Sequence, residues 1–330
     1  MTSNMNRVAV VIPNWNGEDL LSKCIDSLLS QQSLSPVIIV VENGSIDSSL
    51  DILESYGNSI TVLKQPKNLG FAGGVNVGIQ YAIDNNFEYI ALFNNDAVAD
   101  SLWIKKLYDA FQTNENVGIV TSKILIGNTG KLDSTGDWYT TTGMPFPRGR
   151  GEIDSGQYDK KTSVFGASGG ASLYRTSLFR DIGLFDEDFF AYYEDVDISF
   201  RAQLRSWKVL FEPEAIVYHA LSATSSKLGY FAIKQSAKNF WFLYIKNVPF
   251  PLSIKFFPSA LYRYSRMFAA RVIKGGFWAF FGGFIKSLVL LPKKIVQRHS
   301  IQKNRTVSSA YIEKIVYKGK PPIVKSQDTH

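Results

Sequence analysis

Uninterrupted apolar runs recur early in the chain, and they limit its fold more than any other feature. Three of them are Val8–Ile12, Val37–Val41 and Tyr89–Phe93. A strand that is apolar without a break is buried on both faces, as strands of a parallel sheet are. A shorter strand is expected at Ile60–Leu63. Together these segments predict a mostly parallel sheet in the N-terminal part of the chain.

Helical spacing fills the intervals between the strands. Helices are expected at residues 18–32, 48–56 and 70–86. The apolar stripe of the first consists of Leu20, Leu21, Cys24, Ile25, Leu28 and Leu29. Strands that alternate with helices build an α/β fold. Because Cys24 belongs to the stripe, we interpret it as a core residue.

The middle of the chain is less regular. Residues 128–162 are rich in Gly, Thr, Ser, Asp and Arg and show little periodicity. They are predicted to form a long loop region of the kind that often binds ligands. Regular structure is expected again at Val164–Arg175, in a helix around Val196–Trp207 and in a strand at Lys208–Phe211.

The composition excludes several classes of protein. The 330 residues are 45% hydrophobic and 20% charged, which describes a globular chain and not a disordered or collagen-like one. A single cysteine excludes a disulfide-stapled secreted fold and a cysteine-rich metal site. Met1–Asn6 is polar and Val8–Ile12 is too short for a secretory signal, so we expect the protein to stay in the cytoplasm or on its membrane face.

Charge divides the chain into two parts. Residues 1–226 carry 17 Lys and Arg residues against 27 acidic ones. Residues 227–330 carry 19 against two, which are Glu313 and Asp328. We therefore expect an acidic α/β domain at 1–226 and a basic, aromatic-rich, largely helical region at 227–330.

The basic region has a long apolar run at residues 275–291. The run has 17 residues and includes Lys286, whereas a helix that spans a membrane needs about 20 apolar residues. Aromatics mixed with cations favour helices that lie in the membrane interface. The alternatives are a span and a helical subdomain packed on the acidic domain through its aromatics. Nucleic acid fits poorly, because no known binding module accompanies the cations and the acidic domain would repel a phosphate backbone.

Polar clusters follow the ends of predicted strands, where ligands bind in sheets of this kind. Asn94, Asn95 and Asp96 come directly after a buried strand. Their oxygen atoms suit a hard divalent cation. Asn and Asp are also common in turns at strand ends, which is the alternative.

A glycine-rich segment runs from Asn68 to Asn76. Gly70, Gly73 and Gly74 permit close approach of the backbone to a ligand, and the following helix offers free N–H groups to an anion. The spacing matches neither a dinucleotide fingerprint nor a phosphate-binding lysine loop. A plain tight turn is the alternative.

Carboxylates and one histidine complete the candidates. Glu194, Asp195 and Asp197 lie among aromatics where a helix is expected to begin at Val196. They favour a general base that deprotonates a hydroxyl, with helix capping as the alternative. His219 follows a strand-like run, either as a structural residue or as a metal ligand.

Taken in order, these motifs resemble the inverting glycosyltransferases of family 2, whose GT-A fold is a Rossmann-like sheet flanked by helices. The resemblance covers about residues 7–225 and is greatest to bacterial rhamnosyltransferases of cell-surface polysaccharide synthesis. It is carried by seven segments: Val11–Gly17, Val41–Asp47, Asn68–Asn76, Asn94–Asp96, Gly166–Ala171, Tyr193–Asp197 and Val217–His219.

The resemblance implies a sugar–nucleoside diphosphate donor and a divalent metal, Mg or Mn. It places in the nucleoside pocket Pro13, Asn14, Glu42, Asn43 and Asp47. It places near the nucleotide and diphosphate Asn68, Gly73, Asn76, Asn94 and Asn95. The implied metal ligands are Asp96 and His219. The implied catalytic base is Asp195, supported by Glu194, and the acceptor side is shaped by Gly169 and Gly170.

Two positions depart from the family pattern. Glu42 stands where many members have Asp, and its longer side chain would shift recognition of the base. Asn94 occupies the first position of the family's Asp-x-Asp motif and contributes no charge. A modest metal affinity is therefore expected.

The implied function is metal-dependent transfer of L-rhamnose from dTDP-rhamnose to a polyprenyl-diphosphate-linked or glycan acceptor, by a protein peripheral to the cytoplasmic face of the cell membrane. UDP-galactofuranose or a UDP-hexose is the alternative donor. A nucleotidyltransferase would need a basic glycine-rich loop after the first strand, and Asn14–Glu18 contains no cation. A non-catalytic, membrane-docked module that binds sugar nucleotides is the remaining alternative.

Overall fold

The computed structural model describes residues 8–112, 115–220 and 229–319. Its strands are β1 (Val8–Asn14), β2 (Val37–Glu42), β3 (Thr61–Lys64), β4 (Tyr89–Phe93), β5 (Ala97–Ala99), β6 (Val117–Ile126), β7 (Lys131–Ser134), β8 (Asp137–Tyr139), β9 (Pro145–Pro147), β10 (Thr162–Val164), β11 (Ala171–Arg175) and β12 (Lys208–His219). Its helices are α1 (Leu21–Leu29), α2 (Ser49–Ser55), α3 (Gly70–Asp84), α4 (Trp103–Phe111), α5 (Thr176–Ile182), α6 (Glu194–Leu204), α8 (Gly229–Asn247), α9 (Leu252–Lys255), α10 (Phe257–Ile273), α11 (Phe277–Val289), α12 (Leu291–Lys303) and α13 (Ser309–Ile315). Short 3₁₀ helices are η1 (Gly57–Ser59) and η2 (Glu187–Phe189). Met1–Asn6, Asp328 and the expected domain boundary at residue 226 lie outside the described residues.

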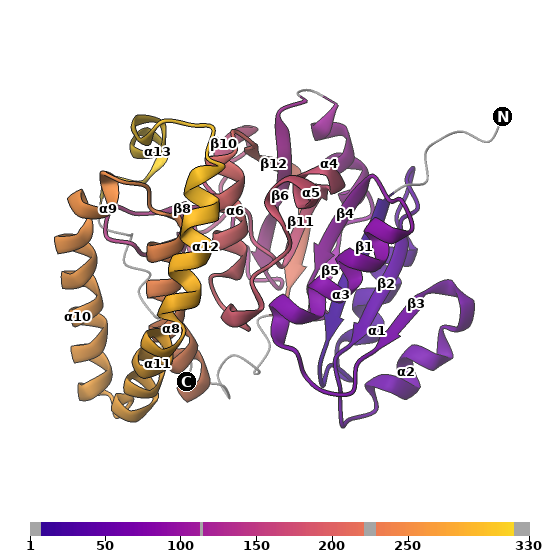
Figure 1. The fold of residues 1–330 in the computed structure, drawn as a ribbon. Helices are drawn as coiled ribbons and strands as arrows, with labels where there is room; N and C mark the ends of the chain where they lie inside the picture. The colour runs from indigo at the N-terminus through magenta and orange to yellow at the C-terminus, as the bar shows by residue number, and fades with distance from the viewer. Residues whose placement is uncertain (1–7, 113–114, 221–228, 320–330) are drawn as a thin grey trace.

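Ten strands form one mixed sheet in the order β10-β12-β6-β11-β4-β1-β2-β3, with β5 beside β12 and β7 beside β6. β3, β2, β1 and β4 run parallel, and so do β6 and β12. β11 lies antiparallel between β4 and β6. Helices flank this sheet (Figure 1), so the predicted α/β fold is confirmed.

The apolar runs form the strands that they predict. β1, β2 and β4 are buried along nearly their whole length, whereas edge strand β3 is mostly half-buried. The parallel register of β1 and β2 places Asn14 opposite Glu42 at the carboxyl end of both strands. Cys24 is fully buried on α1, as its position on the apolar stripe predicts.

Two segments differ from the sequence prediction. The strand expected to end at Phe211 continues as β12 to His219 through an irregularity in its pairing with β6. A bulge of this kind bends a strand without ending it, and here it brings His219 opposite Ala97 of β5. The region 128–162 is not loop throughout, because it contains β7, β8 and β9.

Helix α6 lies between two hydrophobic cores. Ile198 and Ala202 pack with residues of the sheet, whereas Val196 and Phe200 pack with α8 and the helices that follow it. Ten of the eleven residues of α6 are buried. The helix begins at Glu194, two residues before the predicted start.

The C-terminal helices share the second of these cores with the rest of the protein. Figure 1 shows α8, α10, α11 and α12 grouped together on the α6 side of the sheet, far from β1–β3. The ring of Tyr264 on α10 lies 5.2 Å from that of Phe240 on α8 and 5.0 Å from that of Phe280 on α11, centroid to centroid. Phe189 and Phe200 belong to the same cluster. The alternative of helices packed through their aromatics therefore describes this region.

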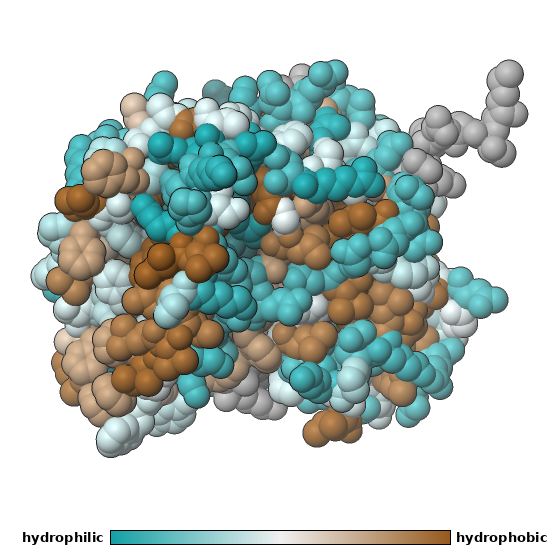
Figure 2. Space-filling model, in the orientation of Figure 1, coloured by the Kyte–Doolittle hydropathy of each residue, from teal (hydrophilic) through white to brown (hydrophobic). Residues whose placement is uncertain are grey.

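The apolar run at residues 275–291 is divided between two helices. α11 ends at Val289, and α12 begins at Leu291 with Pro292 in its first turn. In the described ranges, no helix combines the length and the apolar character needed to cross a bilayer. Figure 2 shows hydrophobic side chains gathered on the surface over α11 and α12. Exposed apolar residues of these helices include Ile285, Leu288, Val289, Ile295 and Val296.

Gly70 allows the start of α3 to contact the segment before α6. Its φ is +74°, and a Cβ there would lie 2.5 Å from the carbonyl oxygen of Phe190.

Gly70→Ala is expected to lower the free energy of unfolding by about 1–3 kcal/mol, because it adds backbone strain and a clash. Denaturant titration measures the loss. Gly57→Ala is the control, because φ is also positive there but nothing lies near the Cβ. Equal losses would contradict a role for the contact.

Candidate active site

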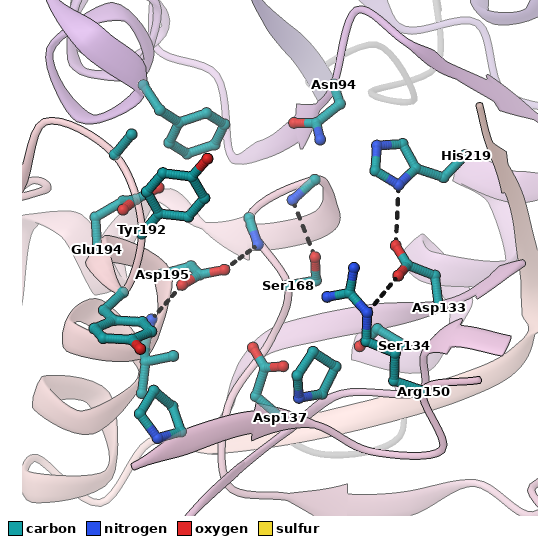
Figure 3. Close-up of a pocket in the computed structure, with 18 of the residues that line it drawn as sticks. Asn94, Asp133, Ser134, Asp137, Arg150, Ser168, Tyr192, Glu194, Asp195 and His219 are labelled. Carbon is teal, nitrogen blue, oxygen red and sulfur yellow. Dashed lines mark hydrogen bonds and ion pairs between the residues drawn. The ribbon is translucent and has the colours of Figure 1, made fainter. Parts of the chain in front are cut away.

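A cleft of about 540 Å³ opens beyond the carboxyl ends of β1 and β4, beside the first turn of α6. Figure 3 shows its polar side chains converging from both sides. The sequence candidates that line it are Pro13, Asn94, Asn95, Asp96, Gly169, Gly170, Glu194, Asp195 and His219. Other residues that line it include Phe71, Asp133, Ser134, Asp137, Arg150, Ser168 and Tyr192. The structure therefore brings together nine of the predicted site residues.

Asp195 is fixed in the first turn of α6. One carboxylate oxygen accepts a hydrogen bond from the N–H of Gly169 at 3.1 Å, and the other accepts one from the N–H of Val196 at 2.8 Å. Burial raises the pKa of Asp195, and these hydrogen bonds offset the effect only in part. Tyr192 and Tyr193 have φ values of 70° and 71°. A backbone held in this rarely populated region is a common feature of active sites.

Two further carboxyl groups crowd the Asp195 side of the cleft. Burial and the charge of Asp195 raise the pKa of Glu194 well above its usual range. Its Oε2 atom has no hydrogen-bond partner in the part of the chain that the structure describes. Burial and the charge of Asp195 also raise the pKa of Asp137. The carboxyl groups on this side of the cleft therefore hold their protons more tightly than isolated carboxyl groups do.

His219 lies on the other side of the cleft, where Figure 3 shows it beside Asp133, and it contacts two carboxylates. Its Nε2 is 2.9 Å from Oδ1 of Asp96, and its Nδ1 is 2.9 Å from Oδ2 of Asp133. Burial opposes the charged imidazole, but the hydrogen bonds to both carboxylates outweigh it and raise the pKa of His219 to about 10. Arg150 approaches Oδ1 of Asp133 at 3.4 Å. This side of the cleft thus combines two cations with two anions.

A chain of hydrogen bonds behind the cleft connects three of the predicted nucleotide-binding residues. Asn95 Nδ2 donates to Asn14 Oδ1 at 2.7 Å, and Asn14 Nδ2 donates to Glu42 Oε2 at 2.8 Å. Oε1 of Glu42 accepts from the N–H of Ser45 at 2.6 Å. Asn14 and Glu42 are buried. They support the loops after β1 and β2 and do not line the cleft.

Asn43 and Asn68 organise the glycine-rich segment. Asn43 donates to Oδ1 of Asn68 at 3.2 Å and to the carbonyl of Gly70 at 3.1 Å. Oδ1 of Asn68 also accepts from the N–H of Gly70 at 2.7 Å. Asp47 is farther along the loop after β2, where it accepts from the N–H of Ser49 at 3.1 Å. None of these three candidates lines the cleft.

Gly73 and Asn76 lie along a separate hollow that also includes Lys64 and Glu187. The side-chain amide of Asn76 makes two hydrogen bonds to the backbone of Phe185. Its Oδ1 accepts from the N–H at 3.0 Å, and its Nδ2 donates to the carbonyl at 2.9 Å. The amide therefore fastens α3 to the segment before η2. The structure does not bring these two residues into the cleft, and their contact with a diphosphate stays a prediction.

Sequence reasoning missed part of the cleft. Asp133, Asp137 and Arg150 come from region 128–162, which was predicted to bind ligands without any residue being singled out. The only signal was the density of polar residues. Without periodicity, nothing in the sequence indicates which of them face inward.

Comparison with known proteins identifies the class. "Glycosyl transferase family 2" matches residues 9–183, so this chain belongs to that family. It is 22% identical over 230 residues to the poly-beta-1,6-N-acetyl-D-glucosamine synthase of Staphylococcus epidermidis, covering 66% of this chain and 50% of the relative. It is 28% identical over 202 residues to the low-salt glycan biosynthesis hexosyltransferase Agl10 of Haloferax volcanii, covering 60% of this chain and 62% of the relative. The chain thus spans less than two thirds of these relatives.

Solved structures show the same fold. S. aureus TarS 1–349 in complex with UDP aligns with a TM-score of 0.53 at 18% identity, over 94% of this chain and 93% of that one. The mannosyltransferase PcManGT from Pyrobaculum calidifontis, in complex with GDP-Man and Mn²⁺, aligns with a TM-score of 0.53 at 15% identity, over 94% and 86%. The predicted GT-A fold with a C-terminal helical region is therefore confirmed.

Proposed function

We propose that this protein transfers a sugar from a nucleoside diphosphate to an acceptor hydroxyl, with inversion at the anomeric carbon. The observation that carries the proposal is the position of Asp195. Its carboxylate is fixed by two backbone N–H groups at one side of a cleft, and His219 lies across from it (Figure 3). Asp96 is paired with His219 at 2.9 Å. This arrangement separates a site for the acceptor from a site for the leaving diphosphate.

Asp195 is proposed as the general base. As the acceptor oxygen forms a bond to the anomeric carbon, its proton passes to a carboxylate oxygen of Asp195. The bond from the anomeric carbon to the diphosphate oxygen breaks at the same time, and the electron pair leaves with the diphosphate. Attack opposite the leaving group inverts the configuration. Glu194 and Asp137, with their raised pKa values, would keep negative charge near Asp195 low.

Asp96 and His219 are proposed to hold a divalent metal. Asp96 Oδ1 and His219 Nε2 converge to 2.9 Å at the edge of the cleft, so a cation would replace the proton that they share. No cluster of three or more His, Cys, Asp or Glu side chains suited to a metal occurs in the described residues. Mg²⁺ or Mn²⁺ could be held by two protein ligands, with waters and phosphate oxygens as the others. When bound, it would offset charge on the leaving diphosphate.

The proposed donor site includes residues that line the cleft and residues of the hydrogen-bond chain behind it. Pro13, Asn94 and Asn95 line the cleft, and the buried Asn14 and Glu42 keep the loops around it in place. The resemblance to rhamnosyltransferases favours dTDP-rhamnose as donor, with UDP-galactofuranose or a UDP-hexose as the alternative. Asn43, Asp47, Asn68, Gly73 and Asn76 are proposed to complete nucleotide binding. Gly169 and Gly170 are proposed to shape the acceptor side.

The acceptor is proposed to be a growing cell-surface glycan or its polyprenyl-diphosphate-linked precursor. Names of relatives support transfer to a polymer: one is a poly(ribitol-phosphate) beta-glucosyltransferase of Bacillus spizizenii, 34% identical over 116 residues, which are 33% of this chain and 18% of the relative. The basic residues and exposed apolar side chains of α11 and α12 suit a protein peripheral to the membrane.

Release of nucleoside diphosphate from a panel of sugar nucleotides tests this function. With Mg²⁺ or Mn²⁺ and a lipid-linked acceptor extract, release is expected from one donor, and dTDP-rhamnose is the first candidate. A chelator is expected to abolish this release, because Asp96 and His219 cannot themselves offset the charge of the leaving diphosphate in place of the cation. Tight nucleotide binding without turnover of any donor would instead favour a non-catalytic binding module.

A further inference from the structure

A second cavity, of about 560 Å³, adjoins the active-site cleft between α8, α10 and α11. Three arginines line it: Arg263, Arg266 and Arg271. All three belong to α10, and each of them lines this cavity. We call this space the arginine cavity.

The arginine cavity contains positive charge without a matching carboxylate. Among the described residues, no Asp or Glu lines it and none forms an ion pair with any of its three arginines. The Nε of Arg263 is buried and has no hydrogen-bond partner in the described ranges. A buried donor without a partner is costly, and a cavity that gathers guanidinium groups suits a phosphate, whose oxygens accept from their forked N–H donors.

The arginine cavity is joined to the cleft through one side chain. Tyr193 lines both spaces, and its hydroxyl lies 3.6 Å from Sδ of Met144, which also lines the arginine cavity. Tyr193 is the N-cap residue of α6 and is two positions from Asp195. A molecule with one end in the arginine cavity could therefore present its other end to Asp195.

Apolar side chains lie exposed near the arginine cavity. On α10 and at the start of α11 they are Phe268, Val272, Ile273 and Trp278, with Trp278 78% exposed. Val272 and Ile273 directly follow Arg271. Cations beside exposed aliphatic and aromatic side chains match a ligand with an anionic head and an apolar chain.

We infer that the arginine cavity binds the phosphate or diphosphate of an amphiphilic acceptor. The sugar of that acceptor reaches Asp195 past Tyr193, and its apolar chain lies against the exposed side chains of α10 and α11. The inference rests on the proposed glycosyltransferase function, which it deepens by assigning the acceptor side. Arg263, Arg266 and Arg271 act here as binding residues and take no part in bond formation.

Binding of farnesyl diphosphate, followed by calorimetry, tests the inference. Saturating UDP, or dTDP in a parallel series, fills the donor site so that the probe cannot occupy it. Arg266→Gln/Arg271→Gln is expected to weaken binding of the probe at least tenfold, because each lost guanidinium removes charge-assisted hydrogen bonds. Both side chains are exposed, so the variant is expected to fold, which circular dichroism checks. The matched Lys variant at both positions is expected to recover part of the affinity.

Lys274→Gln is the control, because Lys274 is an exposed cation at the end of α10 that does not line the arginine cavity. Its affinity for the probe is expected to equal that of the wild type. Equal affinity of all variants would overturn the inference. Farnesol or inorganic diphosphate binding as tightly as farnesyl diphosphate would overturn the amphiphile assignment. Failure of UDP and dTDP to bind the wild type would instead count against the proposed function.

Discussion

Asp195→Asn is expected to lower kcat by about a thousandfold, the usual contribution of a general base. The amide has the same shape and can still accept one of the two backbone hydrogen bonds, but it cannot take the acceptor's proton. Affinity for the nucleoside diphosphate is expected to stay unchanged, because none of the residues proposed to bind the donor is a hydrogen-bond partner of the Asp195 carboxylate. Steady-state kinetics and calorimetry measure the two quantities. Asp51→Asn, at an exposed carboxylate of α2, is the control and is expected to keep full activity.

The pH profile of kcat/KM provides a second readout of the same assignment. Only the deprotonated form of Asp195 can act as the base, so activity is lost as the pH falls through its pKa. Because burial raises that pKa, the acid limb is expected above the value of about 4 that is typical of an exposed Asp. An acid limb below that value, or an Asp195→Asn protein with wild-type turnover, would contradict the assignment.

Lys246→Met is expected to lower the free energy of unfolding by about 3–5 kcal/mol, as the loss of one partner from a buried ion pair does. Lys246 Nζ lies 2.6 Å from Asp186 and 2.9 Å from Asp197, and all three side chains are almost inaccessible to water. The substitution leaves two buried carboxylates without this cation. Urea or thermal unfolding measures the loss.

Lys64→Met is the matched control for that experiment. Lys64 and Glu54 form an ion pair at 2.8 Å, but their side chains are 56% and 59% exposed. Exposed pairs contribute about 0–1 kcal/mol, so the control is expected to unfold nearly as the wild type does. Similar losses in the two variants would show that the buried pair does not hold α8 against α6.

The ion pairs around Lys246 distinguish two aspartates that look equivalent in the sequence. Asp195 and Asp197 both lie in the first turn of α6, among aromatics. Asp195 faces the cleft, whereas Asp197 is fully buried and bonds to Lys246, Arg201 and Asn247. Spacing along the chain placed both near the start of a helix but could not reveal the partners of Asp197, which are mostly distant in sequence.

Much of the sheet was predictable because burial on both faces leaves unbroken apolar runs. Val8–Ile12, Val37–Val41 and Tyr89–Phe93 are such runs, and each forms a strand near the predicted limits. The strand-like run before His219 was recognised, but its continuity with Lys208–Phe211 was missed, because an irregularity between Glu212 and Ile216 interrupts the pairing.

The candidate site was predictable where it follows a strand or opens a helix. Asp96 and Asp195 are of this kind, and both line the cleft. Asp133 and Arg150 are not, because they face the cleft only through the pairing of β7 with β6 and the path of the loop after β9. Long-range pairing of that kind has no local signature in the sequence.

The position of α6 between two cores has a practical consequence for anyone who shortens the gene. The change from an acidic to a basic composition near residue 226 suggests a position for truncating the protein. The product would be an acidic fragment. That fragment would expose Val196 and Phe200 to water and leave Asp197 without Lys246. Expression vectors, fusion tags and library designs should therefore keep the reading frame through at least Tyr317, because Val316 packs in the same core as Phe200 and the N–H of Tyr317 bonds to the carbonyl of Tyr139.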